Sequence, residues 1–245
     1  MKQAAIIAAA PIILMVAARV TVGEAPALGP IARAKAQETA DVDEDYLVSS
    51  GEFFGGELIV ESFSLPKHAV AYVREDFLLD SAGDIVIEGT LVCLPSERGD
   101  DGPTIHMVSA GTILVTGRVH GAPGRSFGGA EGNALGKQGG TGSSIVIEAP
   151  HTHTSGCIVA GTGGSAGAGG AGGSGGSILT IGGALRAGFN IPERALGIYG
   201  GHGGRPGPGS KRIHNGRGGA GGDGGSALSF ADRANVPERY RHLFE

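Results

Sequence analysis

Short stretches in which apolar and polar residues alternate recur along the chain, and a glycine follows most of them. Residues Ser81–Gly89 read SAGDIVIEG and residues Ser109–Gly117 read SAGTILVTG, so the two are near-copies. Ile85 and Ile87 in the first copy, and Ile113 and Val115 in the second, lie two residues apart, which is the period of a β-strand and not of a helix. The glycine indicates a bend or a close approach of two backbones. The pattern therefore predicts repeated short strands.

The apolar spacing returns further along the chain, and runs of glycine lead into it. Leu179, Ile181, Gly183 and Leu185 repeat it in full, and Ile145, Ile147 and Ala149 repeat it in part. Three glycine-rich runs end in strands that begin near Ser144, Ser177 and Ser226. Units of about 28–49 residues that each supply a few short strands are typical of a solenoid, in which stacked units bury a shared core.

The sequence predicts an all-β protein, a parallel β-helix or solenoid with glycine-rich lateral loops and a short C-terminal helix. A β-sandwich of the same strands is the alternative. The predicted segments are a signal peptide and processing region at 1–36, an acidic flexible leader at 37–55, the solenoid at 56–231 with glycine-rich loops at 128–142, 161–176 and 200–225, and a C-terminal helical cap at 232–245. In the cap, Asn235 is expected to cap a helix whose first turn contains Pro237. This helix would cover an open strand end.

Composition sharpens this picture, because glycine makes up 48 of the 245 residues and tryptophan is absent. Small β-branched side chains must supply the core, and they fit the narrow interior of stacked strands. From Gly161 to Gly176, glycine recurs at every third position, which is the period of a polyproline II helix. We hypothesise that the three glycine runs lie side by side and order one another. Disordered lateral loops are the alternative.

The N-terminal stretch has the plan of a secretory signal peptide: Lys2, an apolar run from Ala4 to Ala18, and then Arg19. The run is shorter than the roughly 20 residues that span a bilayer, although an uncleaved anchor is the competing interpretation. We therefore expect an extracellular or cell-surface protein with no membrane span after signal cleavage. In such a compartment Cys93 and Cys157 either pair or remain two buried free thiols.

The repeats at 81–89 and 109–117 resemble the rungs of secreted bacterial right-handed parallel β-helix proteins. That broad group includes autotransporter-passenger and adhesin-like domains and pectate-lyase-like enzymes. The resemblance extends over residues 58–230 and identifies no specific family. It implies a rod-like extracellular domain, and it implies no particular activity.

Few residues in the sequence suggest a catalytic site. His202 lies in GGHGG, which together with Asp100-Asp101 and Lys211–His214 faintly resembles the motifs of polygalacturonase-type glycoside hydrolases. Such enzymes need two or more carboxylates around the scissile bond. About a hundred residues separate these aspartates from His202, and the third motif ends in histidine where that family has lysine. No catalytic residue is therefore assigned.

Two further patterns could bind metal. His151 and His153 would share one face of an extended segment and form half of a zinc site, and solvent-facing turn residues are the alternative. Asp223 completes GGAGGD, the first six positions of a calcium-binding nonapeptide repeat. Gly224 then replaces the apolar residue that this repeat requires. We therefore predict no cofactor, with calcium as the alternative.

These observations favour a secreted structural or interaction protein, used for adhesion, extracellular matrix or glycan contact through the solenoid surface and the glycine-rich loops. A carbohydrate-active β-helix enzyme, either a polysaccharide lyase or a glycoside hydrolase, is the alternative. The positions expected to face outward are Val86, Glu88, Thr90, Leu114, Thr116, Arg118, Val146, Glu148 and Thr180, and they hold no carboxylate cluster. Expected partners are an extracellular polysaccharide, a surface protein or a second copy of the chain. The net charge of −5 argues against nucleic acid.

Overall fold

The structure is a computed structural model that describes residues 45–96, 99–127, 136–182, 185–187, 198–206, 208 and 220–244. The chain divides into two units, residues 1–36 and 37–245, and every described residue belongs to the second unit. The predicted signal peptide and processing region therefore lie outside the described residues.

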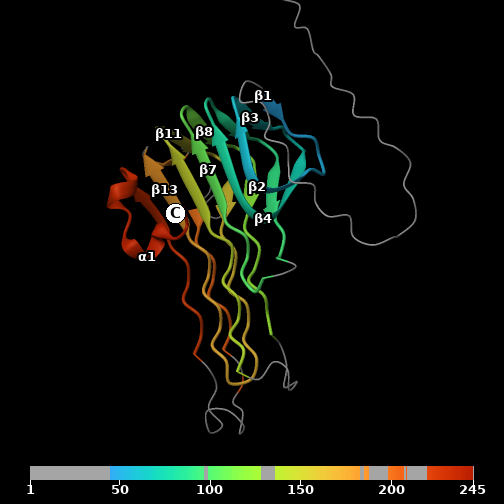
Figure 1. Cartoon of the computed structure of the whole chain (residues 1–245), viewed down its shortest axis with the longest axis vertical. Coiled ribbons are helices and arrows are strands. Elements are labelled where there is room, and N and C mark those ends of the chain that lie inside the picture. The colour runs from blue at the N-terminus through green and yellow to red at the C-terminus, as the bar shows by residue number, and fades with distance from the viewer. Residues whose placement is uncertain are drawn as a thin grey trace, which may run out of the picture. The chain divides into compact units, whose positions relative to one another are not determined.

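The second unit is a parallel β-solenoid whose strands stack on three faces (Figure 1). The first face contains the end of β2 (Phe53–Val60), the end of β4 (Val70–Ser81), β7 (Ile105–Ser109), β10 (Ile145–Ala149), β13 (Ile178–Gly182) and β16 (Ala227–Phe230). The second face contains β1 (Asp45–Leu47), β3 (Ser62–Leu65), β5 (Ile85–Ile87), β8 (Thr112–Val115), β11 (His151–Thr154) and β14 (Leu185–Ala187). The third face contains the starts of β2 and β4, then β6 (Thr90–Cys93), β9 (Arg118–His120), β12 (Cys157–Val159) and β15 (Ile198–Tyr199). All pairings between described strands are parallel, which confirms the solenoid and excludes a sandwich.

The two near-copies are consecutive coils. Ile85 pairs with Ile113 and Ile87 pairs with Val115, so the repeat in the sequence is a repeat in space. A Cβ at Gly117 would collide with the carbonyl oxygen of Gly89, and a Cβ at Gly156 would collide with that of Gly117. The glycine of the pattern therefore marks a close backbone approach, as the sequence predicts.

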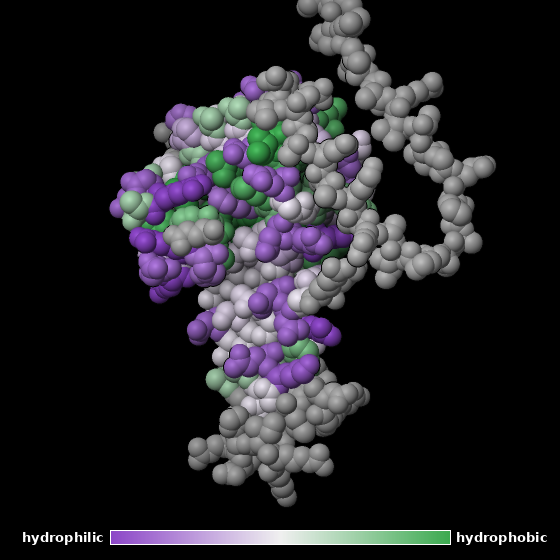
Figure 2. Space-filling view, in the orientation of Figure 1, coloured by the Kyte–Doolittle hydropathy of each residue, from purple (hydrophilic) through white to green (hydrophobic). Residues whose placement is uncertain are grey.

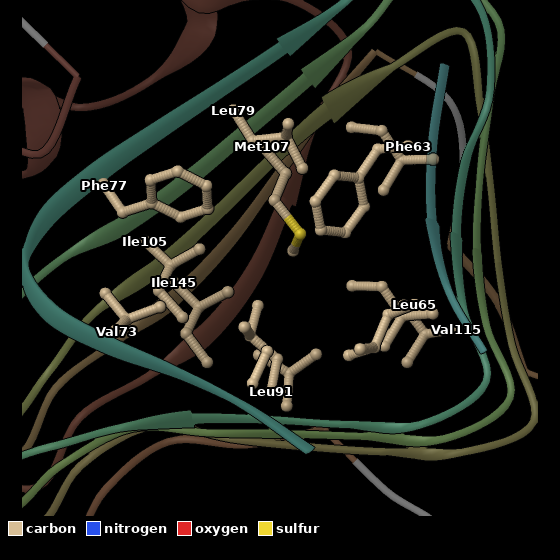
Figure 3. Close-up of a cluster of buried hydrophobic side chains, with 14 of the residues drawn as sticks. Phe63, Leu65, Val73, Phe77, Leu79, Leu91, Ile105, Met107, Val115 and Ile145 are labelled. Carbon is tan, nitrogen blue, oxygen red and sulfur yellow. The ribbon is translucent and has the colours of Figure 1, made fainter. Parts of the chain in front are cut away.

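The core lies between the three faces and consists of one inward side chain for every second strand residue (Figure 3). Its N-terminal end is aromatic. The Tyr46 ring stacks on Phe63 at a centroid distance of 6.0 Å, and the Phe54 ring stacks on Phe77 at 5.1 Å. These contacts start the solenoid at Asp45, so the prediction of a flexible leader up to residue 55 is wrong for residues 45–55. Because that stretch is acidic overall, its composition does not indicate the aromatic contacts that hold it against the core.

The later repeats are placed differently from the prediction. Ile145 and Ile147 pair with Ile105 and Met107 on the first face, and Thr152 and Thr154 take the positions equivalent to Ile113 and Val115. On β13, Ile178 and Thr180 pair with Ile145 and Ile147 and face the core. Leu179 and Ile181 therefore face outward, and the outward placement of Thr180 is wrong. Both faces of this strand are apolar, so alternation alone cannot say which one is inside.

The C-terminal segment explains the outward apolar residues. It contains a 3₁₀ turn (Arg233–Asn235) and helix α1 (Glu238–Arg241), which lies beside β13 (Figure 1). Apolar residues of this segment and of the outer side of the first face form one cluster: Val146, Leu179, Ile181, Leu228, Phe230, Val236, Tyr240, Leu243 and Phe244. The segment thus covers the side of a sheet and not an open strand end. Asp232 caps the 3₁₀ turn by accepting from the Asn235 amide, so the predicted cap at Asn235 is wrong. Pro237 is the N-cap residue of α1 and precedes its first turn, so its predicted place inside that turn is wrong as well.

Both cysteines are free thiols. Cys93 is buried, and this burial raises the pKa of its thiol to about 11. The thiolate is the reactive form, so Cys93 is inert at neutral pH.

Candidate functional site

The three glycine-rich connections project from one corner of the solenoid (Figure 1). They span residues 121–144, 160–177 and 200–226, and each joins a third-face strand to the first-face strand of the next coil. Each connection leaves as a continuation of the third face and comes back as a continuation of the first. We call the described parts outgoing arms (121–127, 160–167 and 200–206) and returning arms (136–144, 171–177 and 220–226). Together they form the glycine bundle.

Backbone hydrogen bonds join neighbouring arms at intervals of three residues. In the outgoing layer the amides of Gly124 and Phe127 donate to Thr162 and Ser165, at 2.8 and 2.7 Å. In the returning layer the amides of Gly139 and Gly142 donate to Ala171 and Ser174, both at 2.9 Å. The third arm of each layer joins the second in the same way. The arms within a layer are therefore parallel and have the period of polyproline II helices.

The two layers also bond to each other. Gly161 and Gly164 donate to the carbonyl oxygens of Ser143 and Gly140, both at 2.8 Å, so arms of opposite layers run antiparallel. The described arms are thus an ordered bundle, which confirms the hypothesis of mutual ordering over disordered loops. One point differs: the run from Gly161 to Gly176 is two helices and not one. A turn at 168–169 separates them, and Gly169 adopts a φ of 78° there.

Glycine is required in the bundle because backbone packs directly on backbone. A Cβ at Gly161 would collide with the carbonyl oxygen of Ala122, and a Cβ at Gly164 would collide with that of Arg125. In the returning arm of the last connection Gly224 has more space, since its Cβ would meet nothing closer than 3.8 Å, whereas a Cβ at Gly222 or Gly225 would collide with a carbonyl oxygen. The interior of the bundle therefore admits almost no side chains.

Most exposed side chains of the bundle lie on its two outer faces, and a few mostly small ones, among them Ala122, Ser143 and Ala166, are buried. The outgoing layer presents Pro123, Ser126, Thr162, Ser165, His202 and Arg205, and the returning layer presents Gln138, Thr141, Ala171, Ser174, Ala220 and Asp223. In Figure 2 the bundle is mostly pale, with hydrophilic residues in groups between the glycines. His202 and Asp223, two of the sequence candidates, are exposed on opposite faces, so the structure does not bring them together.

The Asp100-Asp101 pair has a structural role at the first edge of the bundle. The Asp100 carbonyl oxygen accepts from the Arg125 amide at 2.7 Å, and the Asp101 carboxylate accepts from the Thr141 amide at 2.6 Å. Asp100 also forms an exposed ion pair with Arg125 at 3.4 Å. These aspartates complete the edge and do not meet His202. Lys211–His214, the third motif, lies outside the described residues.

His151 and His153 share the outer face of β11, as predicted, and both are exposed. They lie on a strand and not in a turn, because Thr152 and Thr154 between them face the core. No group of three or more histidine, cysteine, aspartate or glutamate side chains suited to a metal ion occurs among the described residues.

A groove of about 590 Å³ lies on the outer side of the first face, beside the C-terminal segment. Its charged side chains are Asp80, Glu148, Asp232 and Arg233, and its apolar ones include Ile59, Val108 and Ile181. Sequence reasoning missed this groove. Its carboxylates Asp80 and Glu148 both pair with Val108, so they lie two coils apart in one column. Only the strand register could have revealed that.

Arg233 forms a hydrogen-bonded ion pair with the Glu148 carboxylate. Its Nε donates to both carboxylate oxygens, at 2.9 and 2.8 Å, and its Nη2 lies 2.7 Å from Oε2. These hydrogen bonds raise the pKa of the Arg233 guanidinium. His106 Nε2 lies 3.6 Å from the same carboxylate, but burial lowers the pKa of this imidazole. Glu148 therefore holds the C-terminal segment in place and is not a free acid or base.

Comparisons with protein-family models, with curated proteins and with solved structures return no match for this chain. Within the part of the chain that the structure describes, no helix has the length and apolar content needed to cross a membrane.

Proposed function

We propose that this protein is an exported structural or interaction protein, which uses its solenoid surface and glycine bundle for adhesion, matrix assembly or glycan contact. The observation that carries the proposal is the bundle itself. It extends two sheet faces beyond the solenoid core and places most of its exposed side chains on two outer faces. A scaffold of this kind supports surface display, and its interior leaves no room for a substrate.

Export is supported by the N-terminal sequence, and it is tested separately. The full chain is expressed in a secreting bacterial host, and the N-terminus of the protein recovered outside the cytoplasm is sequenced. Small-x-small motifs end at Ala27 and Ala36, so we expect a mature N-terminus just after one of them. Recovery of the chain only from the cytoplasm, with its N-terminus intact, would contradict export.

The enzyme alternative has a weaker basis. An inverting hydrolase separates its two carboxyl groups by roughly 6.5–9.5 Å, and a separation of two coils is of that order. However, Arg233 neutralises Glu148, so Asp80 has no free acidic partner in that column. We expect no release of unsaturated or reducing sugar ends from pectins and related polymers. Robust turnover would overturn the non-enzymatic proposal.

The interaction role is tested with a screen of glycans and matrix proteins. The protein is compared with a variant that lacks residues 161–176 and with Thr162→Glu/Ser165→Glu, which changes only outward positions of the outgoing layer. Ser174→Glu on the returning layer is the matched control. Loss of binding in the outgoing-layer variant but not in the control supports display by that face. If the intact protein binds nothing in the screen, the proposal fails.

A further inference from the structure

The solenoid begins and ends with a complete coil of three strand segments. The first coil consists of β1 and the two halves of β2, and the last coil consists of β14, β15 and β16. In the part of the chain that the structure describes, no strand pairs with the outer edge of β1, β2, β14 or β16. An unpaired edge is a template on which a further strand can add through backbone hydrogen bonds.

The last coil exposes its inner side to solvent. Ala227 and Ser229 of β16 pair with residues of β13 that face the core, so they point inward, yet both are exposed. The C-terminal segment does not cover them, because its apolar residues contact Leu228 and Phe230 on the outer side of the same strand. The core therefore ends at this coil in small side chains with an open inner side.

The first coil ends the core with large side chains. Phe54, Leu58 and Val60 point inward and are buried. The half-buried Tyr46 ring lies 6.1 Å from the Phe54 ring between centroids. A first coil placed on a last coil would therefore set large side chains against small ones, which is how facing layers of a core interdigitate.

Among the described residues, large apolar side chains that are exposed occur only in these two coils. They are Leu47, Phe53 and Tyr199, with exposed fractions of 69%, 49% and 43%. Phe53 begins a column of paired residues on the third face, and Tyr199 ends it. A second copy that continues the solenoid would thus place its Phe53 on Tyr199, as Phe53 lies on Tyr72 within one copy at a centroid distance of 5.2 Å.

The strand register specifies the contact on the first face as well. Leu58 begins the inward column that ends at Ser229, and Ile59 begins the outward column that ends at Phe230. In a continued solenoid, Leu58 of the next copy meets Ser229 inside the core, and Ile59 meets Phe230 on the outer side. Apolar surface of the first coil is then buried on both sides of the sheet.

The two ends also differ in charge. Residues 45–61, which form the first coil, contain four carboxylates and no lysine or arginine. Residues 227–244, which contain β16 and the C-terminal segment, have three arginines against two carboxylates. Opposite charge favours contact between unlike ends over contact between two like ends.

We propose that copies of this protein associate head to tail, so that the first coil of one copy continues the last coil of another. The two surfaces differ, so the contact is heterologous, and each added copy presents a new open end. In-line continuation of the coils does not close into a ring, and the product is a filament. This inference rests on the matrix-assembly role in the proposed function and names the partner as a second copy of the chain.

Sedimentation of the full chain over a concentration series tests the association. We expect the average mass to rise with concentration beyond that of a dimer, and electron microscopy to show rods that lengthen. Ser229→Glu sets a carboxylate against the acidic first coil and should weaken association by at least about tenfold. Leu47→Lys/Phe53→Lys sets two ammonium groups against the positive end and should weaken it as much. Ser229→Ala keeps a small side chain and should associate like the unchanged protein.

An equimolar mixture of the two end variants is the most specific test, because they block opposite ends. The last coil of Leu47→Lys/Phe53→Lys can still bind the first coil of Ser229→Glu. At a concentration where each variant alone is monomeric, we expect the mixture to form a one-to-one dimer that does not grow. Native mass spectrometry with one variant isotopically labelled measures this. Thr116→Glu and Thr116→Lys are the matched controls, since Thr116 is exposed in a middle coil, and both should associate like the unchanged protein.

The three substituted positions are exposed in a single copy, and thermal melting verifies that each variant is folded. A chain that stays monomeric at every concentration overturns the inference, and so does an unchanged protein that stops at a dimer. Association that neither end variant weakens places the contact elsewhere and overturns it too. If the chain is monomeric and an end variant loses binding to a matrix protein of the screen, the open end fits that protein and not a second copy. These outcomes concern this inference alone, because the screen tests display by the glycine bundle with substitutions at 162, 165 and 174.

Discussion

The solenoid and the glycine bundle stack in the same direction but are held together in opposite ways. In the solenoid, side chains such as Ile85 and Ile113 fill the interior, and burial of apolar surface stabilises the coils. In the bundle, backbone meets backbone, and a single added methyl group at Gly161 would collide with a carbonyl oxygen. One region is specified by the side chains that it contains, and the other by the side chains that it lacks.

This difference has an energetic consequence. Glycine loses more backbone freedom on folding than any other residue, and the bundle buries little apolar surface to offset that loss. Its stability must come from dense backbone hydrogen bonds and from its anchorage to the solenoid strands, which the arms continue without a break. We therefore expect the bundle to open locally before the solenoid unfolds.

The largest expected effect is in the solenoid core. Ile113→Ala removes a fully buried side chain that packs between consecutive coils, and it should lower the free energy of unfolding by about 2–5 kcal/mol. Leu114→Ala changes the next residue, which lies on the outer side of β8, and it should lower the free energy of unfolding by about 1 kcal/mol or less. Urea unfolding followed by circular dichroism measures both. Equal losses of stability in the two variants would contradict the placement of Ile113 on the inner side of β8 and Leu114 on its outer side.

Gly161→Ala tests the bundle in the same manner. The new Cβ would overlap the Ala122 carbonyl oxygen, so we expect a loss of about 1–3 kcal/mol that is concentrated in the bundle. Gly224→Ala is the matched control, because its Cβ would have 3.8 Å of clearance, and it should change the stability by about 0.5 kcal/mol or less. Thermal melting together with limited proteolysis of the arms measures the difference. Two neutral substitutions would contradict direct backbone packing.

Thr152→Val should stabilise the protein, by about 1 kcal/mol. The Thr152 hydroxyl is buried in the core and has no hydrogen-bond partner among the described residues, whereas the Thr154 hydroxyl donates to the Val115 carbonyl oxygen at 3.2 Å. The same substitution at Thr154 should therefore be neutral or destabilising. Chemical denaturation distinguishes the two variants. A stability gain at Thr154 and none at Thr152 would reverse the assignment of the two hydroxyl groups.

The smallest expected effect is on pH dependence. Burial lowers the pKa of His106 in the folded state, so the unfolded chain binds more protons at this residue. Its contribution to stability is therefore complete above the ordinary pKa of 6.5 and is lost as the pH falls below that value. Asp80, Glu148 and Arg233 are the charged groups that act on the imidazole. His106→Leu should flatten the stability profile between about pH 7 and pH 5. If stability changes with pH in His106→Leu as steeply as in the unchanged protein, His106 does not cause the pH dependence.

The sequence predicts the solenoid well where one side of each strand is polar. At 81–117 the alternation identifies both the strands and the side that faces the core. At 178–181 it fails, because the C-terminal segment makes the outer side apolar as well. The prediction of a flexible leader up to residue 55 fails for a related reason. Tyr46 holds this stretch in place through ring contacts with Phe54 and Phe63, and a local sequence pattern does not reveal such contacts.

The candidate sites were harder to predict than the fold. The pairing of His151 with His153 on one face follows from strand alternation, and it is correct. The ion pair between Glu148 and Arg233 depends on where the C-terminal segment packs, and the column that Asp80 and Glu148 share depends on the register between coils. That register is set by connections of unequal length, which no single stretch of sequence specifies.

Residue-resolved hydrogen exchange tests the ordered glycine bundle most directly. Across 161–176 the amides of Gly161, Gly163, Gly164, Gly172, Gly173, Gly175 and Gly176 donate to carbonyl oxygens of other arms. None of the described carbonyls accepts from Thr162, Ala171 or Ser174, whose side chains lie on the outer faces. We predict slow exchange at the glycines and fast exchange at these three residues, in a pattern of period three. Uniformly fast exchange across 161–176 would contradict the bundle.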